Sequence, residues 1–430
     1  MGRLAYFFST FPKLSETFVR SQVQATRALG LACLTAANRR PAVGSYDPQD
    51  QDLVRTTFYL TPVQPLAYGQ ALWWAWQHRP QALAASLRMA LTLQDGGRRQ
   101  PWRHLAHLAG AALLARFCQA QQVAQVHVHY AYGAASVAMF LQALAGIPYS
   151  LSIHGSDVLL ANPFLEAKLA AARFIVSNCR YHCRQLQARF PALATKRFYV
   201  VPGGVDLRQG LWAASVPPAP DGPLRLLLVG RLVPVKGIDL LLEACARLQR
   251  QQIPFICRIV GDGPERPRLA ARIQTLGLER TVTLLGARYQ EEVARLYDWC
   301  QVVVLSSRSE GTPMTIIEAM AKARPVVAPR LTAIPEMVTE GETGFLFEPG
   351  DAADLAAQLA RLAAASELRA RLGTAARQQA AAKFDLWTNA WQFLAILAQE
   401  VPALDLHQSL EVPDAIPHNL SPLGYHSLSG

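Results

Sequence analysis

The stretch that decides the fold of this chain reads Glu310-Gly311-Thr312-Pro313-Met314-Thr315-Ile316-Ile317-Glu318-Ala319-Met320-Ala321. An apolar run, Val302 to Leu305, precedes it and predicts a buried parallel strand. After a loop, we expect Thr312 to cap a helix that starts at Pro313 and ends before Pro325. A strand, a loop and a helix in this order predict an open α/β sheet, which binds ligands outside the carboxyl ends of its strands.

Two carboxylates of this stretch lie on either side of the predicted helix N-terminus. Glu310 is on the loop, and Glu318 is five residues into the helix, about 7.5 Å along the axis from Pro313. Between them the helix offers unpaired N–H groups and partial positive charge, which suit a phosphate group. One carboxylate near a reacting centre, another near hydroxyls and an anion site between them suit a sugar nucleotide. A loop glutamate and a solvated helix glutamate would explain the spacing equally well.

Strand and helix patterns alternate through both halves of the chain. Apolar runs predict strands at residues 4–8, 33–37, 126–130, 149–153, 174–177 and 198–201, and again at 224–229, 255–260, 282–285, 302–305 and 325–328. Helical patterns lie between them, including one over 351–383, so we expect doubly wound parallel sheets. The expected organisation is a domain at 1–206, a proline-rich linker at 207–222, a domain at 223–384, a helix at 385–400 and a tail at 401–430.

Composition places the chain among globular proteins. Its 430 residues suit two domains, and 51% are hydrophobic while 17% are charged. We find no run of about 18 uncharged apolar residues, which argues against a membrane-spanning helix. The seven cysteines have no regular spacing and suggest reduced thiols in a cytoplasmic setting. Cys179, His182 and Cys183 are three potential metal ligands, but without a second cluster we expect no zinc site.

Positive charge is concentrated in the first half of the chain. Residues 1–206 carry 20 Lys or Arg and 8 Asp or Glu, whereas residues 207–430 carry 22 and 23. A net charge of +12 suggests an anionic partner for the first half, either a phospholipid surface, a lipid pyrophosphate or nucleic acid. No recognition-helix, zinc-finger or RNA-binding pattern is present, so we do not expect a nucleic-acid partner.

Residues 60–120 combine arginine with tryptophan. Six arginines and four tryptophans occur here among many Leu and Ala, and the only acid is Asp95; the set is Arg79, Arg88, Arg98, Arg99, Arg103, Arg116, Trp73, Trp74, Trp76 and Trp102. Several segments have helical periodicity. Basic and aromatic residues on amphipathic helices suit a membrane interface. An equally good interpretation is that these helices pack on the domain core and extend their arginines into solvent.

The stretch at 310–321 is similar to the E-x7-E signature of family 4 retaining glycosyltransferases, which have the GT-B fold. Further similarities are Gly230-Arg231 with Lys236-Gly237, Gly261-Asp262-Gly263, His154-Gly155-Ser156-Asp157, Ala323-Arg324-Pro325-Val326-Val327-Ala328 and the opening Phe11-Pro12-Lys13-Leu14-Ser15-Glu16-Thr17-Phe18, which resembles exopolysaccharide enzymes of the colanic-acid type. The resemblance spans roughly residues 4–395. It implies two Rossmann-like domains facing across a cleft, the first binding the acceptor and the second the nucleotide sugar, with the helix at 385–400 returning to the first.

The resemblance also implies a donor site. Arg231 and Lys236 would hold the diphosphate leaving group, because fixed cations stabilise its developing charge in the transition state. Glu310 would contact the donor sugar and Glu318 the ribose hydroxyls. The full implied set is Gly230, Arg231, Lys236, Gly261, Arg288, Glu310, Gly311, Thr312, Pro313, Met314, Thr315 and Glu318. Read from position alone, Arg231, Lys236 and Arg288 would be surface cations.

Five residues of the first half are implied on the acceptor side or at the reacting centre. His154 ends a predicted strand and would hydrogen-bond the donor sugar or support the reacting centre, which completes the implied catalytic set of Glu310, His154, Arg231 and Lys236. Asp157 would orient the acceptor or cap the next helix. Ser15, Glu16 and Thr17 would contact the acceptor or a phosphate, although Ser15 also fits a helix cap.

No metal or other cofactor is expected. Asp50-Gln51-Asp52 matches a D-x-D metal motif, but its turn-rich neighbours favour a solvated loop. If Arg231, Lys236 and a helix N-terminus neutralise the diphosphate, a cation is redundant, and GT-B enzymes generally work without one.

The expected function is that of a metal-independent, retaining, hexosyl-type glycosyltransferase of the cytoplasm. It would move a sugar from a nucleotide-diphosphate sugar to a polysaccharide or lipid-linked oligosaccharide acceptor. The first expectation for the donor nucleotide is UDP and the second is GDP. Peripheral contact with an anionic membrane is also expected. Two alternatives stay open: a catalytically silent membrane-associated scaffold of polysaccharide assembly, and a GT-B sugar-nucleotide epimerase.

Overall fold

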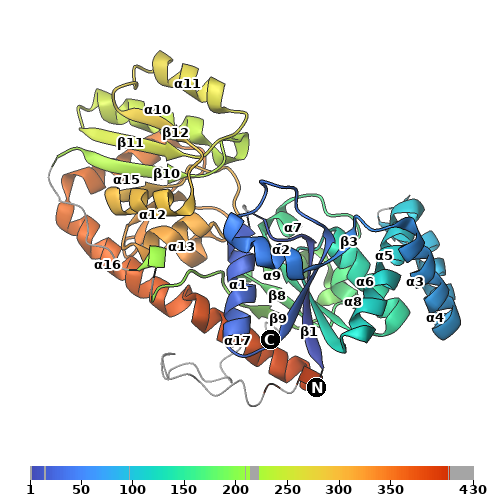
Figure 1. Cartoon of the computed structure of the whole chain (residues 1–430). Coiled ribbons are helices and arrows are strands. Elements are labelled where there is room, and N and C mark those ends of the chain that lie inside the picture. The colour runs from blue at the N-terminus through green and yellow to red at the C-terminus, as the bar shows by residue number, and fades with distance from the viewer. Residues whose placement is uncertain are drawn as a thin grey trace. The chain divides into compact units, whose positions relative to one another are not determined.

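The computed structural model describes residues 2–13, 16–95, 97–208, 210–213, 222–404 and 406 (Figure 1). The chain forms two compact units. The first consists of Met1–Val201 with Trp387–Gly430, and the second is Pro202–Leu386. The chain therefore passes between the units twice, after Val201 and after Leu386.

The first unit is built on a seven-stranded parallel sheet. Its strands, in spatial order, are β3 (Phe58–Thr61), β2 (Cys33–Arg39), β1 (Arg3–Thr10), β6 (Val123–His129), β7 (Tyr149–Ile153), β8 (Ile175–Ser177) and β9 (Phe198–Val200). The order of addition reverses between β1 and β6. In open α/β sheets, ligands bind outside the carboxyl ends of the strands at such a reversal.

Helices cover both faces of this sheet. They are α1 (Thr17–Ala28), α2 (Gln51–Thr56), α3 (Pro65–His78), α4 (Pro80–Thr92), α5 (Pro101–Ala120), α6 (Gly133–Ala145), α7 (Gly155–Leu159), α8 (Leu165–Ala171) and α9 (Arg180–Arg189). Helix α6 packs against α5, and α3 and α4 pack on α5 in turn (Figure 1). Between α4 and α5 the short strands β4 (Gln94–Asp95) and β5 (Arg98–Arg99) form an antiparallel pair.

The last helix belongs to the core of the first unit. In α17 (Leu386–Glu400), Phe393 and Leu397 are buried in the same apolar cluster as Leu4 and Tyr6 of β1. Glu400 accepts two hydrogen bonds from the Arg197 Nη1, at 2.7 and 2.8 Å. Burial of one apolar stripe together with this ion pair fixes the end of the helix.

The second unit is a six-stranded parallel sheet. In spatial order the strands are β12 (Val282–Gly286), β11 (Phe255–Val260), β10 (Leu224–Val229), β13 (Val302–Val304), β14 (Val326–Pro329) and β15 (Gly344–Phe347). The helices are α10 (Ile238–Arg250), α11 (Arg266–Thr275), α12 (Gln290–Trp299), α13 (Met314–Ala321), α14 (Ile334–Met337), α15 (Ala352–Ala364) and α16 (Ser366–Lys383). The prediction of parallel, doubly wound sheets is confirmed in both units.

Some details of the elements differ from the prediction. Residues 351–383 form two helices rather than one, because Ala365 has an extended conformation, with φ −134° and ψ 91°. The side chain of Arg369 donates to the carbonyl oxygens of Leu362 and Ala363 and so satisfies the end of α15. Nothing in an Ala-rich sequence marks such a break. Strand β3 of the first unit and strand β15 of the second unit, each at an edge of its sheet, were not predicted.

Candidate active site

The loop between β13 and α13 holds Glu310 with its carboxylate largely buried. The Thr332 hydroxyl donates to the Glu310 carbonyl oxygen at 2.6 Å and fixes the backbone of the loop. Helix α13 begins at Met314, and its N-cap is Pro313 in an extended conformation. The predictions that Thr312 is the cap and Pro313 the first helical residue are therefore wrong. The pyrrolidine ring fixes φ near −65° in extended backbone as readily as in a helix.

Glu310 and Lys236 form an ion pair in this part of the second unit. The distance between the Lys236 Nζ and the Glu310 Oε1 is 2.5 Å, and the Ser307 hydroxyl donates to the same oxygen at 2.6 Å. The side chains are only 22% and 9% exposed, so solvent screens the pair weakly. The candidate site thus joins a carboxylate and an ammonium group from loops 74 residues apart.

Glycine allows these loops to approach each other. A Cβ on Gly237, which has φ +57°, would lie 2.1 Å from the carbonyl oxygen of Ser306. A Cβ on Gly261, with φ +133°, would lie 1.9 Å from the carbonyl oxygen of Gly230. Both distances are below any van der Waals contact, and both φ values disfavour other residues. Gly230, Gly237 and Gly261 therefore hold the loops after β10, β11 and β13 together at the carboxyl edge of the sheet.

Two arginines lie at the same edge of the sheet. Arg231 follows β10; it is exposed and forms no ion pair with any described carboxylate. Arg288 follows β12 and lies 3.8 Å from Glu292, one helical turn further along the chain. Arg231 therefore leaves its guanidinium available to an anion, whereas Arg288 has an exposed internal partner.

Glu318 is half-buried and is bound by a tyrosine of the second unit. The Tyr297 hydroxyl donates to the Glu318 Oε2 at 2.8 Å. Burial raises the pKa of the Glu318 carboxyl to about 7 from 4.5, and the hydrogen bond from Tyr297 opposes that rise. Tyr297 comes from α12, and no spacing in the sequence connects it with Glu318. That the backbone N–H groups of Gly311, Thr312 and Thr315 face the donor stays a prediction.

His154 lies at the carboxyl end of β7 in the first unit, and both its ring nitrogens have partners. Its Nε2 is 3.3 Å from the Nδ1 of His129, and its Nδ1 is 3.3 Å from the Nδ2 of Asn178. The rings of Tyr130 and Phe18 lie 4.2 and 5.2 Å away between centroids. Burial holds the pKa of His154 well below its ordinary value, so the ring is neutral. A hydrogen bond from His154 to a substrate would require one of these contacts to break.

Asp157 has the contacts of a helix cap. Its Oδ2 accepts from the backbone N–H of His154 at 2.8 Å, and its Oδ1 accepts from that of Ala131 at 2.9 Å. The side chain is fully buried, and burial raises its pKa to about 7. These contacts agree with the alternative that Asp157 caps the next helix. They also connect the loops after β6 and β7.

The remaining acceptor-side predictions lie where α1 begins. Ser15 falls outside the described residues. Glu16 precedes α1, and its carboxylate is 2.6 Å from the Lys13 Nζ. Thr17 is the first residue of the helix. Glu16 and Thr17 therefore lie just beyond the carboxyl end of β1, next to the reversal of strand order.

The D-x-D match does not lie in a solvated loop, so that prediction is wrong. Asp50 ends a short 3₁₀ helix, Pro48–Asp50, and is buried against Arg20 at 3.0 Å, while Asp52 is in α2. The turn-forming residues before Asp50 misled the prediction, because they build the 3₁₀ helix. Over the described ranges, no group of three or more His, Cys, Asp or Glu residues could hold a metal ion.

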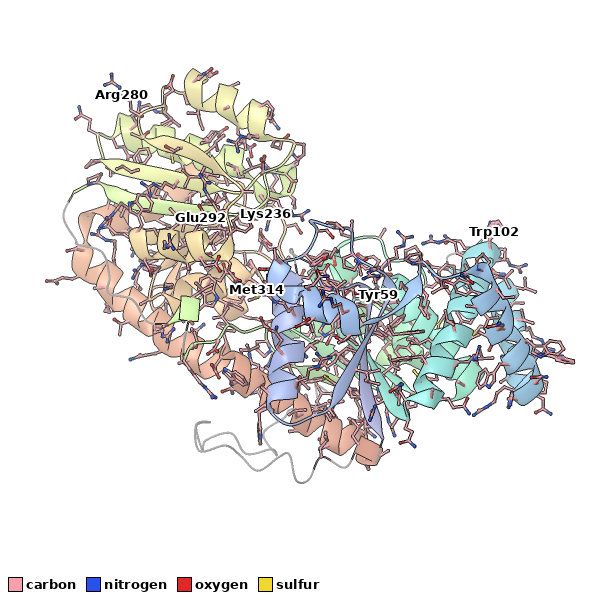
Figure 2. All side chains as sticks on the ribbon, in the orientation of Figure 1. Tyr59, Trp102, Lys236, Arg280, Glu292 and Met314 are labelled. Atoms are coloured by element: carbon pink, nitrogen blue, oxygen red, sulfur yellow. The ribbon has the colours of Figure 1, made fainter. Side chains whose placement is uncertain are left out.

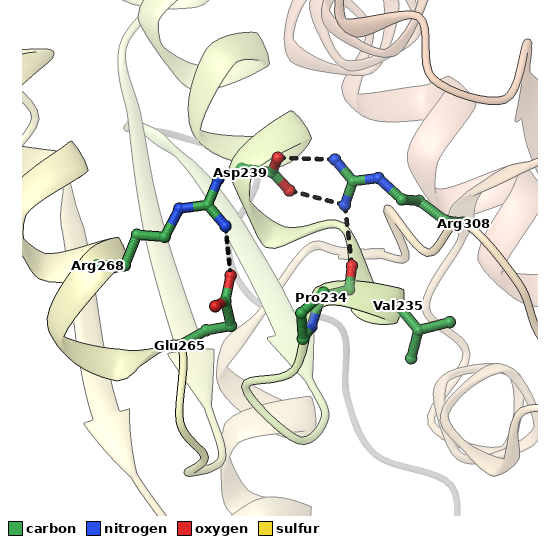
Figure 3. A pocket seen from close by; sticks show the side chains of 6 residues that line it. All are labelled: Pro234, Val235, Asp239, Glu265, Arg268 and Arg308. Atoms are coloured by element: carbon green, nitrogen blue, oxygen red, sulfur yellow. Dashed lines mark hydrogen bonds and ion pairs between the residues drawn. The ribbon is translucent and has the colours of Figure 1, made fainter.

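A surface hollow of about 310 Å³ lies beside the loop of Lys236 (Figure 3). Two ion pairs line it: Arg308 binds Asp239 through two hydrogen bonds of 2.9 and 2.7 Å, and Arg268 binds Glu265 at 2.7 Å. Since these charges already neutralise each other, the hollow offers little to a charged ligand. None of the predicted site residues lines it.

Two family models match consecutive parts of the chain. The model for glycosyltransferase family 4 matches residues 78–209, and the model for glycosyl transferases group 1 matches residues 214–379. The chain belongs to glycosyltransferase family 4. It is therefore a glycosyltransferase, and its two parallel-sheet units are the two halves of a GT-B fold.

Similar proteins agree with this family. The amylovoran biosynthesis glycosyltransferase of Erwinia amylovora is 29% identical over 84% of this chain and 90% of its own length. A putative colanic acid biosynthesis glycosyltransferase of Salmonella typhimurium is 38% identical, over 33% of this chain and 36% of its own. The solved sucrose-phosphate synthase of Thermosynechococcus elongatus aligns with a TM-score of 0.70 and 21% identity, over 93% of this chain and all of the other. Anabaena HepE in complex with UDP-glucose gives 0.68 and 20%, over 92% and 99%.

Proposed function

We propose that this glycosyltransferase retains configuration and moves a hexose from a nucleotide-diphosphate sugar to a growing polysaccharide or lipid-linked oligosaccharide. The observation that carries the proposal is the Lys236–Glu310 pair, with Arg231 nearby along the chain and in no ion pair with a described carboxylate. Arg231 and Lys236 together balance the two negative charges of a donor diphosphate. The donor releases Glu310 from Lys236, and the freed carboxylate faces the positive charge that develops on the anomeric carbon.

Metal independence follows from the same charges. As the glycosidic bond breaks, the leaving diphosphate gains a further negative charge. Arg231, Lys236 and the N-terminus of α13 supply fixed positive charge for it, so the proposed reaction has no step that requires a divalent cation. No further cofactor enters the proposal.

Retention is proposed as a reaction on one face of the sugar. The acceptor hydroxyl approaches from the side of the leaving group, and the departing phosphate takes its proton, so no strong protein base is required. Glu16 is an acceptor-side carboxylate that this reaction does not require as a base. His154, with its ring held by His129 and Asn178, supports the shape of the reacting centre rather than transferring protons.

UDP is the proposed donor nucleotide and GDP the second choice. HepE, which shares the fold, was solved with UDP-glucose. Glu318, half-buried beside Tyr297, suits the paired hydroxyls of a ribose. Relatives named for amylovoran and colanic acid biosynthesis support an exopolysaccharide as the product.

The proposed location is the cytoplasmic face of a membrane, to which the protein attaches peripherally. Over the described ranges, no helix is long and apolar enough to cross a bilayer. The basic first half and a lipid-linked acceptor both favour contact with an anionic surface.

Release of the nucleotide from a panel of sugar nucleotides, with and without EDTA, tests the proposal. We expect one donor to be used, undiminished by EDTA, and use of that donor to disappear in Glu310→Ala and in Arg231→Ala. Wild-type transfer in both variants would overturn the proposal. Interconversion of the donor without an acceptor would favour the epimerase, and absence of donor binding at high concentration would favour the scaffold.

A further inference from the structure

Exposed apolar side chains gather on one part of the first unit. Of the twelve large apolar residues that are clearly exposed in the described part of the chain, seven lie between residues 66 and 105. They are Leu66, Trp73, Trp76, Leu87, Leu91, Trp102 and Leu105. The others are scattered over both units. Single exposed apolar residues are ordinary, but a group that includes three tryptophans at 58%, 56% and 63% exposure indicates an interaction surface.

These seven residues come from the outward surfaces of α3, α4 and α5, which we call the α3–α5 face. Leu66, Trp73 and Trp76 follow a helical spacing on α3, and the rings of Trp73 and Trp76 are 4.8 Å apart between centroids. Leu87 and Leu91 are one turn apart on α4. Helices α3 and α4 both pack on α5, and the residues of the α3–α5 face are exposed among the described residues of the first unit (Figure 1). Figure 2 shows Trp102 at the end of this layer.

Positive charge surrounds the apolar residues of the α3–α5 face. Arg79, Arg88, Arg99 and Arg103 are exposed, and none of them forms an ion pair with a described carboxylate. Asp95 is the only acid between residues 60 and 120, and its carboxylate accepts the backbone N–H of Phe164 at 2.9 Å. The face therefore presents tryptophan and leucine within a field of uncompensated arginine.

The α3–α5 face reaches the edge of the sheet that carries the acceptor-side residues. Helix α5 ends three residues before β6, beside the start of β1, so its first turn lies at the carboxyl edge of the strands. A Cβ on Gly133, just beyond β6, would be 3.9 Å from the His107 Nε2 of α5. The Trp102 end of the face thus shares an edge with Glu16 and His154.

We propose that the α3–α5 face docks on the surface of an anionic phospholipid bilayer. Indole rings prefer the boundary between headgroups and acyl chains, and arginine binds the lipid phosphates. Charge argues against a second copy of the chain, because a symmetric pairing of this face would set arginine against arginine. The inference deepens the proposed peripheral location, and it would place a lipid-linked acceptor next to the carboxyl edge of the first unit.

Sedimentation with vesicles tests the docking. Phosphatidylcholine vesicles with and without phosphatidylglycerol are mixed with the full-length protein. Wild type is expected to sediment with the anionic vesicles only. The triple variant Trp73→Ser, Trp76→Ser and Trp102→Ser should weaken binding at least tenfold. Replacing Arg79, Arg88, Arg99 and Arg103 by Glu should weaken it by roughly fivefold or more per residue, from about 1 kcal/mol for each lost cation.

Matched control variants distinguish vesicle binding through this face from nonspecific binding. Val43, Ile256 and Tyr289 are exposed apolar residues elsewhere, and Arg250, Arg280 and Arg371 are exposed arginines of the second unit. Their replacement by Ser and by Glu should leave vesicle binding unchanged. An equal loss in these controls would overturn the proposal, as would failure of wild type to sediment at low salt.

Two further readouts keep the outcomes distinct. A wild type that dimerises while the tryptophan variant is monomeric would overturn the membrane proposal in favour of a second copy. Binding of the donor nucleotide, measured by calorimetry without vesicles, should be equal in wild type and the face variants. Intact vesicle binding without donor binding would contradict the proposed catalysis and leave the docking face standing.

Discussion

The carboxyl edges of the two sheets hold different kinds of polar groups. In the second unit, Lys236 and Glu310 are brought together by loops that contact each other through glycine backbones. In the first unit, His154 and Asp157 are buried and engaged by the protein itself. One edge presents charge that a ligand can take over, and the other presents polar groups already used to hold loops. The first arrangement suits the binding of a diphosphate, and the second suits a rigid wall.

Removing the cation of the Lys236–Glu310 pair should have the largest effect on transfer. Lys236→Ala leaves the Glu310 carboxylate buried without its partner and removes a donor to the diphosphate. We expect kcat/KM for transfer to fall by about a hundredfold or more. Arg308→Ala is the matched control, since Arg308 pairs with Asp239 in the surface hollow, and it should change transfer less than about threefold. Equal losses in the two variants would show that the Lys236–Glu310 pair has no special role in transfer.

The contact of Gly261 with the loop after β10 should also be sensitive to substitution, and here the effect is on stability. Gly261→Ala introduces a Cβ 1.9 Å from a carbonyl oxygen at a positive φ, whereas Gly341→Ala meets nothing within 4 Å at φ +73°. We expect Gly341→Ala to cost about 1–2 kcal/mol of unfolding free energy. Gly261→Ala should cost about 1–3 kcal/mol more, because backbone must move. Chemical denaturation measures both, and equal values would show that the loops are not held by this contact.

The pH dependence of donor binding should report Glu318. Burial raises its pKa to about 7, so the carboxylate that would accept the ribose hydroxyls exists above that pH and becomes protonated as the pH falls through it. Donor affinity should therefore be highest above pH 7 and decrease below it. Glu318→Gln should weaken binding about tenfold at high pH and flatten the profile. Calorimetric titration of the nucleotide across this range measures it, and an unchanged profile in the variant would assign the titration elsewhere.

The smallest effect is expected from Asp157. Among the described residues, its oxygens accept from backbone N–H groups and the Asn162 amide. Asp157→Asn should therefore cost about 1 kcal/mol of unfolding free energy and leave the KM for the acceptor unchanged. Thermal unfolding and acceptor titration check the two parts. A tenfold higher acceptor KM at unchanged stability would show that Asp157 binds the acceptor instead.

The sequence predicted the sheets better than the side-chain contacts. Buried parallel strands are continuous apolar runs, so the bounds of β7, β10 and β11 agree with those expected. The donor-side residues were predicted from motifs that are local in the sequence, and their roles stay predictions. Tyr297 and His129 were missed because each contacts a partner more than twenty residues away that only the fold brings near. Ser307 was missed although it is only three residues from Glu310, because a loop sequence does not show which way a hydroxyl points. The start of α13 was missed because proline fits both a helix and the extended residue before it.

Nucleotide release from the true donor, compared between wild type and Lys236→Ala in the presence of EDTA, tests the central claim most directly. The claim is that Lys236 exchanges Glu310 for the donor diphosphate and makes a metal unnecessary. We predict that wild type releases nucleotide undiminished by EDTA, while Lys236→Ala releases about a hundredfold less. Release that EDTA abolishes in wild type, or that persists in Lys236→Ala, would contradict it.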